Sequence, residues 1–409
     1  MDCESRMSDV SRRTFLKAGM ATAAAVSMPV AARAQKEGEE ATQTIPRRIL
    51  GTRTGESVTM LNLGTTSVPE ERILNAAYSQ GIRYLDTAKS YGKGASEKAI
   101  AEWFSDNGKR KEFFIVTKDR PETPQKLIES VDARLEALKT DYIDMFFLHG
   151  LGGGFGGDDK TVLDWPKSKE WAEAGKKVKQ SGKVRFIGFS THAKVPLRIE
   201  LLNNAAKGSW VEAIMLAYDP KTVRENEEFN QAIDACHKAG IGLVCMKEMR
   251  AAENAGDFLP EFESMGLSPH EAVLHAVWTD ERFASICSKM PNLKILEENC
   301  NAARKFKPLD SLKMGSVLKL YGGSCATFCN ACDGSCQKAG KTGAALNDIT
   351  RYLTYYERDG MRDEARRLYR ALPPEERDWR DADLQAASRA CRTNLDFAAL
   401  LKRAEEKLA

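Results

Sequence analysis

Residues 84–91 run Tyr-Leu-Asp-Thr-Ala-Lys-Ser-Tyr, and this stretch sets the frame for the rest of the chain. Asp86 ends a short apolar run that predicts a buried strand, and two later runs of this kind end at Lys118 and His149. The intervals of 32 and 31 residues are about the length of one strand–helix unit in a barrel of eight. The C-terminal strand ends of such a barrel converge at one mouth, so these side chains are expected to meet there with Tyr91.

Outward from this stretch, apolar strands alternate with amphipathic helices over residues 46–308. A hairpin over residues 47–58, with turns at Gly51 and Gly55, is expected to close the bottom of the barrel. The pattern predicts an α/β fold: a (β/α)8 TIM barrel followed by a small, mainly α-helical and cysteine-rich C-terminal domain over residues 309–409. Strands are expected near residues 61–64, 84, 115, 143–148, 184–189, 213–216, 242–245 and 284–286, and helices over stretches such as 70–80, 123–138 and 227–239.

A phenol, an ammonium, a carboxylate and an imidazole at one mouth indicate a general acid whose pKa is tuned by its neighbours. A free tyrosine has a pKa of about 10, and Lys118 would lower that of Tyr91 while Asp86 holds the lysine charged. Other interpretations stay open: Asp86 and Lys118 also fit a buried ion pair, and the barrel also fits a binding or electron-transfer protein without catalysis.

At these residues the chain resembles the aldo-keto reductases. Residues 84–92 are similar to the family's signature for its aspartate and tyrosine, residues 116–118 to its lysine strand, and residues 144–149 to its histidine strand. The resemblance extends from about residue 46 to about residue 307. It implies an oxidoreductase in which Tyr91 exchanges a proton with a carbonyl or alcohol, His149 orients the carbonyl, and a nicotinamide cofactor carries the hydride. The implied substrate is a small-molecule carbonyl compound or a sugar.

The same resemblance implies cofactor contacts at the strand ends and at the last barrel helix. The sequence departs from the family pattern at two points. Met215 stands in place of the usual glutamine, and the series of Lys, Ser and Arg residues that binds the 2′-phosphate of NADP is incomplete. NADP is therefore favoured over NAD only slightly. The residues expected to contact the cofactor are Gly64, Thr65, Ser190, Met215, Tyr218, Met246, Ser288, Lys289, Glu298 and Asn299.

Two segments beside the mouth allow more than one interpretation. Residues 150–159 are rich in glycine and directly follow His149, which predicts either a substrate loop or a solvated linker. His192 follows the strand near residues 184–189 and is expected either to reach the mouth or to lie in a solvent-facing turn.

The tail carries a dense cysteine run that resembles the bacterial ferredoxin motif, although its first gap is one residue longer and Gln337 replaces the usual proline. The resemblance implies one 4Fe–4S cluster held by Cys325, Cys329, Cys332 and Cys391, with Cys336 left over, or by the four clustered cysteines. Zinc, disulfides and an empty remnant stay open. The remaining barrel cysteines are expected to be buried small hydrophobes: Cys236, Cys245, Cys287 and Cys300.

The N-terminus has a twin-arginine pattern at residues 11–17, an apolar run over residues 18–30 and a small-residue cleavage site at residues 32–34. We expect a signal peptide over residues 1–34, a linker over residues 35–45, and export in the folded state by the twin-arginine machinery to the periplasm. The apolar run is shorter than the roughly 20 residues of a spanning helix, so no stable membrane span is expected. The combination of barrel, ferredoxin-like tail and twin-arginine leader resembles a class of exported aldo-keto reductases with iron–sulfur tails, and this resemblance implies a redox partner protein. The net charge of +3 gives no argument for nucleic acid.

Overall fold

The structure is a computed structural model that describes residues 44–152, 162–246, 262, 265–323, 329, 334–357, 361–391 and 395–409. Residues 44–409 form one compact unit, and residues 1–43 lie outside the described part. None of the helices in the described ranges is both long enough and apolar enough to cross a bilayer.

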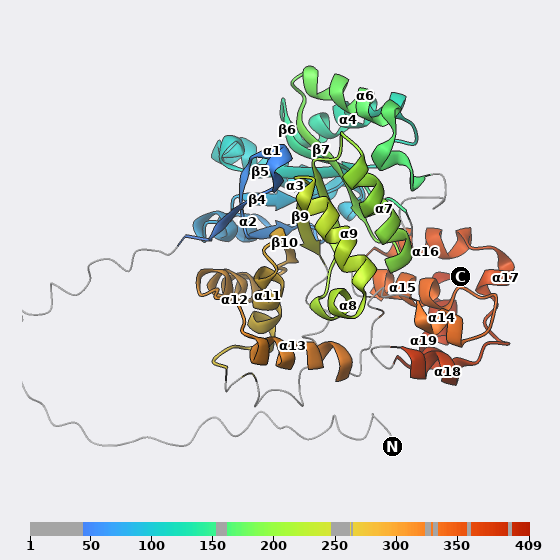
Figure 1. The fold of residues 1–409 in the computed structure, drawn as a ribbon. Helices are drawn as coiled ribbons and strands as arrows, with labels where there is room; N and C mark the ends of the chain where they lie inside the picture. Colours follow the sequence, from blue (N-terminus) through green and yellow to red (C-terminus); the bar gives the residue numbers. More distant parts are fainter. Residues whose placement is uncertain are drawn as a thin grey trace, which may run out of the picture. The chain divides into compact units, whose positions relative to one another are not determined.

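Eight parallel strands close into a barrel in the order β10-β3-β4-β5-β6-β7-β8-β9 (Figure 1). Each expected strand is found, so the predicted (β/α)8 fold is confirmed. The strands are β3 (Leu61–Gly64), β4 (Tyr84–Asp86), β5 (Phe114–Asp119), β6 (Ile143–Leu148), β7 (Val184–Thr191), β8 (Ala213–Ala217), β9 (Gly242–Met246) and β10 (Phe283–Lys289).

Helices cover the outside of the barrel, and their apolar faces pack on the outward residues of the strands. Residues at the helix ends cap these helices: at the start of α11, for example, Ser268 and Glu271 form a capping box. The barrel helices are α2 (Glu71–Ser79), α3 (Ala95–Asn107), α4 (Leu127–Leu138), α6 (Lys169–Gln180), α7 (Val195–Lys207), α8 (Pro220–Glu225), α9 (Glu227–Lys238), α11 (Pro269–Thr279) and α12 (Leu293–Arg304).

The predicted hairpin closes the bottom of the barrel. Strands β1 (Arg47–Ile49) and β2 (Ser57–Thr59) pair antiparallel, with the short helix α1 (Gly51–Thr54) between them. Leu50 and Val58 reach into the inner core of the barrel. A side chain at Gly51 would place its Cβ 2.4 Å from the backbone nitrogen of Gly242, so only glycine permits this close approach.

The tail has a hydrophobic core of its own, formed by residues from Cys329 to Leu408. The domain boundary is expected after residue 308. In the structure, however, Leu309 and Val317 pack with Ala272 and Val273 of α11. Helix α13 therefore belongs with the barrel, and the separate core starts at Cys329. The helices after the barrel are α13 (Ser311–Gly323), α14 (Ser335–Ala339), α15 (Leu346–Glu357), α16 (Arg362–Ala371), α17 (Pro374–Arg377), α18 (Leu384–Ala390) and α19 (Phe397–Leu408).

The tail docks on loops that leave the C-terminal ends of the barrel strands. Glu364 of α16 pairs with Arg120, just after β5, at 2.8 Å. Asp348 of α15 pairs with Lys194, just after β7, at 3.0 Å. The tail helices thus lie beside the same end of the barrel at which the sequence places the reactive side chains.

Candidate active site

Strand parity directs the predicted tetrad into the barrel. Phe114 and Val116 of β5 belong to the inner core, and Lys118 continues this inward series. Tyr84 is likewise an inner-core residue two positions before Asp86. On β6, Met145 and Phe147 face inward, which directs His149 inward as well. The alternation of apolar residues along each strand therefore decides which side chains reach the mouth.

The structure brings the four predicted residues together. The Lys118 ammonium donates to Asp86 Oδ1 at 2.5 Å and to the carbonyl oxygen of Thr87 at 2.8 Å. The same ammonium lies 5.0 Å from the centre of the Tyr91 ring. The rings of Tyr91 and His149 meet edge to face, with centroids 6.0 Å apart and planes at 81°. Lys118 is thus placed between a carboxylate and a phenol.

All four side chains are shielded from solvent. Asp86 and Lys118 are each 1% exposed, His149 5% and Tyr91 9%. Burial raises the pKa of Asp86, while the charge and hydrogen bond of Lys118 and the thiol of Cys287 lower it. In a site of low dielectric constant, an ammonium acts strongly on a neighbouring phenol and favours its ionised form.

A left-handed turn holds the loop that follows Tyr91. Gly92, Lys93 and Gly94 have φ values of +57°, +57° and +93°. At Gly92 a Cβ would lie 2.4 Å from Cγ2 of Val68, so any larger residue would have to displace Val68. The turn fixes the direction from which Tyr91 enters the mouth.

A chain of hydroxyl groups supports this part of the site, and most of this chain has no signal in the sequence. Ser96 Oγ lies 2.8 Å from Thr87 Oγ1 and donates to Thr65 Oγ1 at 2.6 Å. Thr65 in turn donates to the carbonyl oxygen of Asp86 at 2.8 Å. Cys287, expected as a buried hydrophobe, is only half-buried and lies close enough to Asp86 to affect its pKa. The expectation of burial is confirmed for Cys236, Cys245 and Cys300.

Ser190 lies beside the loop that leaves His149. Its hydroxyl accepts a hydrogen bond from the backbone N–H of Gly150 at 3.1 Å, and its carbonyl accepts one from Leu151 at 2.8 Å. His192 is buried at the end of β7, which resolves its open placement in favour of the protein interior. Most of the expected substrate loop over residues 150–159 lies outside the described residues, which end at residue 152 on this side.

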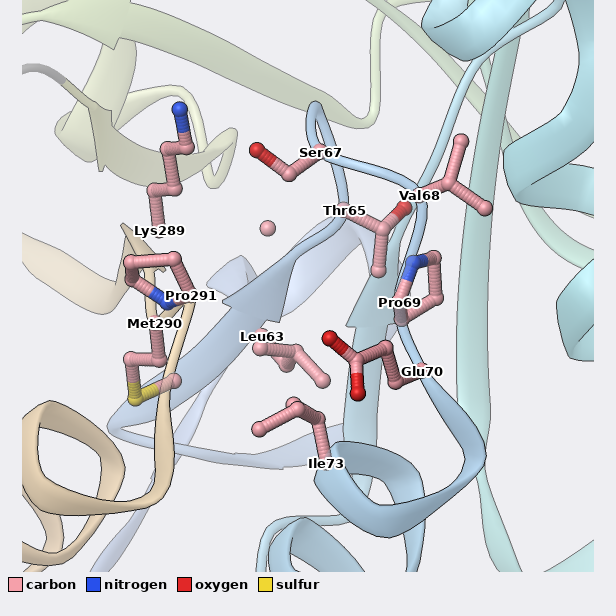
Figure 2. A pocket seen from close by; sticks show the side chains of 11 residues that line it. Leu63, Thr65, Ser67, Val68, Pro69, Glu70, Ile73, Lys289, Met290 and Pro291 are labelled. Carbon is pink, nitrogen blue, oxygen red and sulfur yellow. The ribbon is translucent and has the colours of Figure 1, made fainter.

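Three expected cofactor residues line one small cavity of about 30 Å³ between the ends of β3 and β10. They are Gly64, Thr65 and Lys289, and Figure 2 shows Lys289 and Glu70 on opposite sides of this space. Nearby, the Asn299 amide donates to Ser288 Oγ at 3.1 Å.

The other expected cofactor residues are distributed differently. Met215 and Met246 belong to the inner core of the barrel. Tyr218 belongs to the outer layer, where its hydroxyl donates to Asp280 at 2.9 Å and its ring contacts Phe283. The structure therefore does not bring Tyr218 together with the mouth residues. Glu298 is exposed on α12.

The tail core contains the three candidate metal ligands that the structure describes. Cys329, Cys336 and Cys391 are all buried in it. Cys325 and Cys332 lie outside the described residues. Within the described ranges, no three Cys, His, Asp or Glu side chains lie close enough together to hold a metal ion. Any centre of four thiolates therefore has to include the cysteines beyond those ranges.

Comparison with known proteins adds two family models. One, described as the Aldo/keto reductase family, matches residues 58–257. The other, for a TAT (twin-arginine translocation) pathway signal sequence, matches residues 9–29 and indicates export by that route.

Curated relatives match over different lengths. The uncharacterized oxidoreductase YqkF of Bacillus subtilis is 30% identical over 277 residues, which are 59% of this chain and 85% of that protein. The aldo-keto reductase yakc of Schizosaccharomyces pombe, whose name includes NADP(+), is 28% identical over 187 residues, covering 43% of this chain and 50% of that protein. This chain thus spans half of the length of yakc.

A solved structure agrees with the fold. The holo form of aldo-keto reductase AKR11C1 from Bacillus halodurans superposes with a TM-score of 0.55 at 23% identity, covering 68% of this chain and 96% of that one. The family model spans most of the barrel, and YqkF is matched over most of its length. The chain belongs to the aldo/keto reductase family.

Proposed function

We propose that this protein is an NADP-dependent oxidoreductase that interconverts a carbonyl compound and an alcohol at the barrel mouth. The observation that supports this most directly is the Lys118 ammonium, 2.5 Å from Asp86 and 5.0 Å from the Tyr91 ring, beside His149. A buried ion pair alone would need neither the phenol nor the imidazole. Their convergence supports acid–base chemistry.

In this proposal Tyr91 is the general acid in reduction and the general base in oxidation. Lys118 lowers the pKa of the phenol, so that the proton moves more readily to the substrate oxygen. Asp86 holds the ammonium in place, and the carbonyl of Thr87 holds it from a second direction. His149 donates a hydrogen bond to the same substrate oxygen and aligns the carbonyl. The nicotinamide, when bound, supplies the hydride.

We assign the cofactor to the side of the mouth formed by the ends of β3, β7, β8, β9 and β10. We assign Ser190, Met215 and Met246 to the nicotinamide half. Lys289 and the start of α12 suit the phosphates, because a helix N-terminus and a lysine both attract anions. Asn299 holds Ser288 in this arrangement at 3.1 Å. Glu298, exposed on α12, stays assigned to the adenosine end.

The test is a cofactor titration followed by a turnover screen. Purified protein is titrated with NADPH and with NADH by fluorescence, and then offered carbonyl compounds and sugars with cofactor absorbance as the readout. We expect tighter binding of NADPH and turnover of at least one substrate class. Tight NADPH binding with no turnover of any class would favour a non-catalytic binding or electron-transfer protein. Absence of NADPH binding would overturn the proposal.

For the tail we propose one 4Fe–4S cluster held by Cys325, Cys329, Cys332 and Cys391, with zinc on the same thiolates as the alternative. Three observations support a thiolate centre in this position. Cys329 and Cys391 come from segments far apart in the sequence yet are buried in one core. Cys336, the expected spare, lies in the same core. Arg351, also buried in the tail, has donors that lack a partner among the described residues.

Anaerobically prepared protein should be brown and should contain about four irons per chain if the ferredoxin resemblance holds. Cys391→Ser should lower the iron content more than Cys336→Ser, because only Cys391 is assigned as a ligand. The reverse ranking would replace Cys391 by Cys336 in the ligand set. Colourless protein with stoichiometric zinc would establish the alternative.

We also propose that the protein acts in the periplasm. Free pyridine nucleotide is scarce outside the cytoplasm, so an exported reductase has to retain its cofactor or receive electrons from a partner protein. Export in the folded state permits both the nicotinamide and the cluster to be loaded before translocation. Recovery of the mature protein from the periplasmic fraction with bound NADP would support this location, and its retention in the cytoplasm would contradict it.

A further inference from the structure

Cys287 of β10 faces the inside of the barrel, unlike the other barrel cysteines. It packs against the inner core, whereas its neighbour Ile286 belongs to the outer layer between strands and helices. Cys287 is half-buried. The fully buried cysteines of the outer layer are Cys236, Cys245 and Cys300. The thiol of Cys287 is therefore directed towards the interior space that the reactive side chains share.

A glycine gives this thiol room to reach the neighbouring strand pair. Strand β3 lies between β10 and β4, and Gly64 pairs with Lys289 on one side and with Asp86 on the other. A Cβ at Gly64 would lie only 2.9 Å from Sγ of Cys287. The thiol thus occupies the space that a side chain at position 64 would fill, directly beside the residue that pairs with Asp86.

The carboxylate of Asp86 accepts a hydrogen bond from this thiol. Asp86 is 1% exposed, and its Oδ1 accepts from the Lys118 ammonium at 2.5 Å. Burial raises the pKa of Asp86, and both Lys118 and the hydrogen bond from Cys287 lower it. Because a hydrogen bond to the ionised form of a carboxyl favours that form, the thiol acts in the same direction as the ammonium. The two donors come from strands on opposite sides of β4.

The titratable groups around Asp86 come from the strands on both sides of it and from its own strand. Burial raises the pKa of Tyr84 well above its usual value, so that this phenol stays neutral. Strand β3 contributes no charge here, because its residue beside Asp86 is Gly64. The groups are Tyr84 of β4, Lys118 of β5, Cys287 of β10 and, beyond Lys118, Tyr91 and His149.

We propose that Cys287 is a positioning residue of the reaction, whose thiol donates to Asp86 and holds this carboxylate as the anionic partner of Lys118. This role rests on the proposed function above, in which Lys118 acts on Tyr91. The thiol transfers no proton or electron to the substrate. It acts through Asp86, because an aligned anion keeps the ammonium 5.0 Å from the Tyr91 ring.

The test compares Cys287→Ala with Cys287→Ser in the full-length protein. Alanine removes the donor, whereas serine keeps an O–H donor at nearly the same place. We expect kcat to fall roughly five- to tenfold in Cys287→Ala, the size expected for one lost hydrogen bond, with NADPH affinity unchanged. Cys287→Ser should retain the wild-type kcat. Cys245→Ala is the matched control, because Cys245 pairs with Ile286 from the next strand and belongs to the outer layer.

The pH profile distinguishes a role in charge from a role in packing. Without the thiol, Asp86 loses a hydrogen bond that lowers its pKa. The carboxylate should then take up a proton at higher pH, and the loss of kcat on the acid side should begin at higher pH in Cys287→Ala than in the wild type. Cys287→Ser should keep the wild-type profile. A packing defect alone would lower kcat by the same factor at every pH.

The outcomes separate this role from the proposed function. Wild-type kcat and an unchanged pH profile in Cys287→Ala would overturn the role of Cys287 and leave the reductase standing. Equal losses in Cys287→Ala and Cys287→Ser would also overturn it, because serine keeps the donor. If Cys287→Ala fails to fold, Cys287→Val fills the space without a donor and takes its place. A wild type that binds NADPH but turns over no substrate would contradict the proposed function itself, and the role of Cys287 with it.

Discussion

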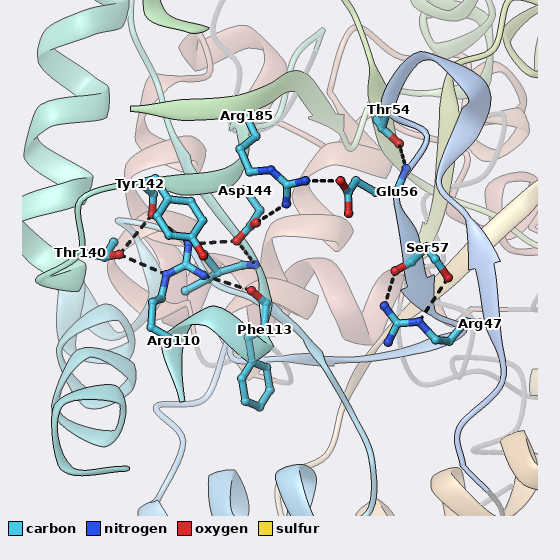
Figure 3. A network of polar contacts seen from close by, with 11 residues as sticks. Arg47, Thr54, Glu56, Ser57, Arg110, Phe113, Thr140, Tyr142, Asp144 and Arg185 are labelled. Atoms are coloured by element: carbon cyan, nitrogen blue, oxygen red, sulfur yellow. Dashed lines mark hydrogen bonds and ion pairs between the residues drawn. The ribbon is translucent and has the colours of Figure 1, made fainter. Parts of the chain in front are cut away.

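Each end of the barrel contains a buried aspartate, and the two carboxylates differ in the number of hydrogen bonds that they accept. At the bottom, Asp144 of β6 accepts from Arg185 on Oδ1 at 2.7 Å, and from Arg110 and the Ile115 N–H on Oδ2 at 2.9 and 3.0 Å (Figure 3). At the mouth, Asp86 Oδ1 accepts from Lys118, whereas the buried Oδ2 has no N–H or O–H donor among the described residues, and the only other donor that acts on this carboxylate is the weak thiol of Cys287. The first carboxylate is fully satisfied and the second is not.

We interpret this difference as a loss of folding stability at the mouth, where the side chains serve the reaction. A buried polar atom without a partner costs roughly 1–3 kcal/mol, and a catalytic role is one of the reasons for which native structures keep such atoms. In barrels of this kind, residues at the bottom contribute to stability and residues at the top to reactions. Substitutions at the bottom should therefore change unfolding, and substitutions at the mouth should change turnover.

The largest difference between an effect on turnover and an effect on binding is expected from Tyr91→Phe. This change removes the proton donor and keeps the ring, so turnover should fall by about 10²–10⁴-fold, while NADPH affinity should hardly change. Steady-state rates and a fluorescence titration measure the two quantities. Tyr84→Phe is the control, because the Tyr84 hydroxyl is also buried and has no partner among the described residues. Normal turnover in Tyr91→Phe would show that the reaction does not depend on this residue of the mouth.

At the bottom, Asp144→Asn should lower the free energy of unfolding by about 3 kcal/mol, because it leaves two arginines without their shared charge. Below the unfolding transition, kcat should stay at the wild-type value. Urea unfolding followed by circular dichroism gives the stability. Asp378→Asn, at an exposed ion pair with Arg380, should leave it nearly unchanged. A large loss of kcat in folded Asp144→Asn would contradict the division between the two ends.

The sequence was sufficient for the fold and for the tetrad because both depend on local, periodic signals. Strand parity decided that Lys118 and His149 point inward, and the interval between strand ends decided that they meet. The same parity beyond Met215 places Tyr218 in the outer layer, whereas the family resemblance implies a cofactor contact for Tyr218.

Contacts between distant segments could not be predicted in this way. The hydroxyl chain through Ser96 joins α3 to two strand ends, and nothing in the sequence around Ser96 indicates its partners. The packing of α13 on α11 and the docking of Arg351 on His192 likewise depend on how the tail folds back. Hydrophobic period alone does not specify which element covers which surface.

The coupling inside the mouth can be tested with Lys118→Met in the direction of alcohol oxidation, where Tyr91 accepts the proton. Without the ammonium the pKa of the phenol returns towards its usual value of about 10. The rate should fall at least about tenfold at neutral pH and recover in part as pH rises towards that pKa. The double variant Asp86→Asn/Lys118→Met should recover stability without recovering the neutral rate. Identical pH–rate profiles in Lys118→Met and the wild type would show that the lysine does not tune the tyrosine.

The smallest expected effect comes from two lysines in left-handed backbone, Lys93 beside Tyr91 and Lys139 at the end of α4, with φ values of +57° and +48°. Glycine relieves this strain, although it also increases the entropy of the unfolded chain. Lys139→Gly should therefore gain about 0.5–1 kcal/mol, as glycine does at other helix ends. Lys93→Gly has the same gain but loses the ion pair with Asp363, in which the two side chains are 83% and 62% exposed.

Loss of the exposed ion pair offsets part of this gain, so the stabilisation in Lys93→Gly should be smaller than in Lys139→Gly. The difference between the two variants in urea unfolding then measures how strongly α16 holds the Tyr91 loop. Raised salt should reduce that difference, because the pair is exposed. Lys139→Gly should leave kcat unchanged, whereas Lys93→Gly should lower it slightly by loosening the loop that carries Tyr91. Equal stabilisation and equal kcat in both variants would show that the tail does not hold the Tyr91 loop through Lys93.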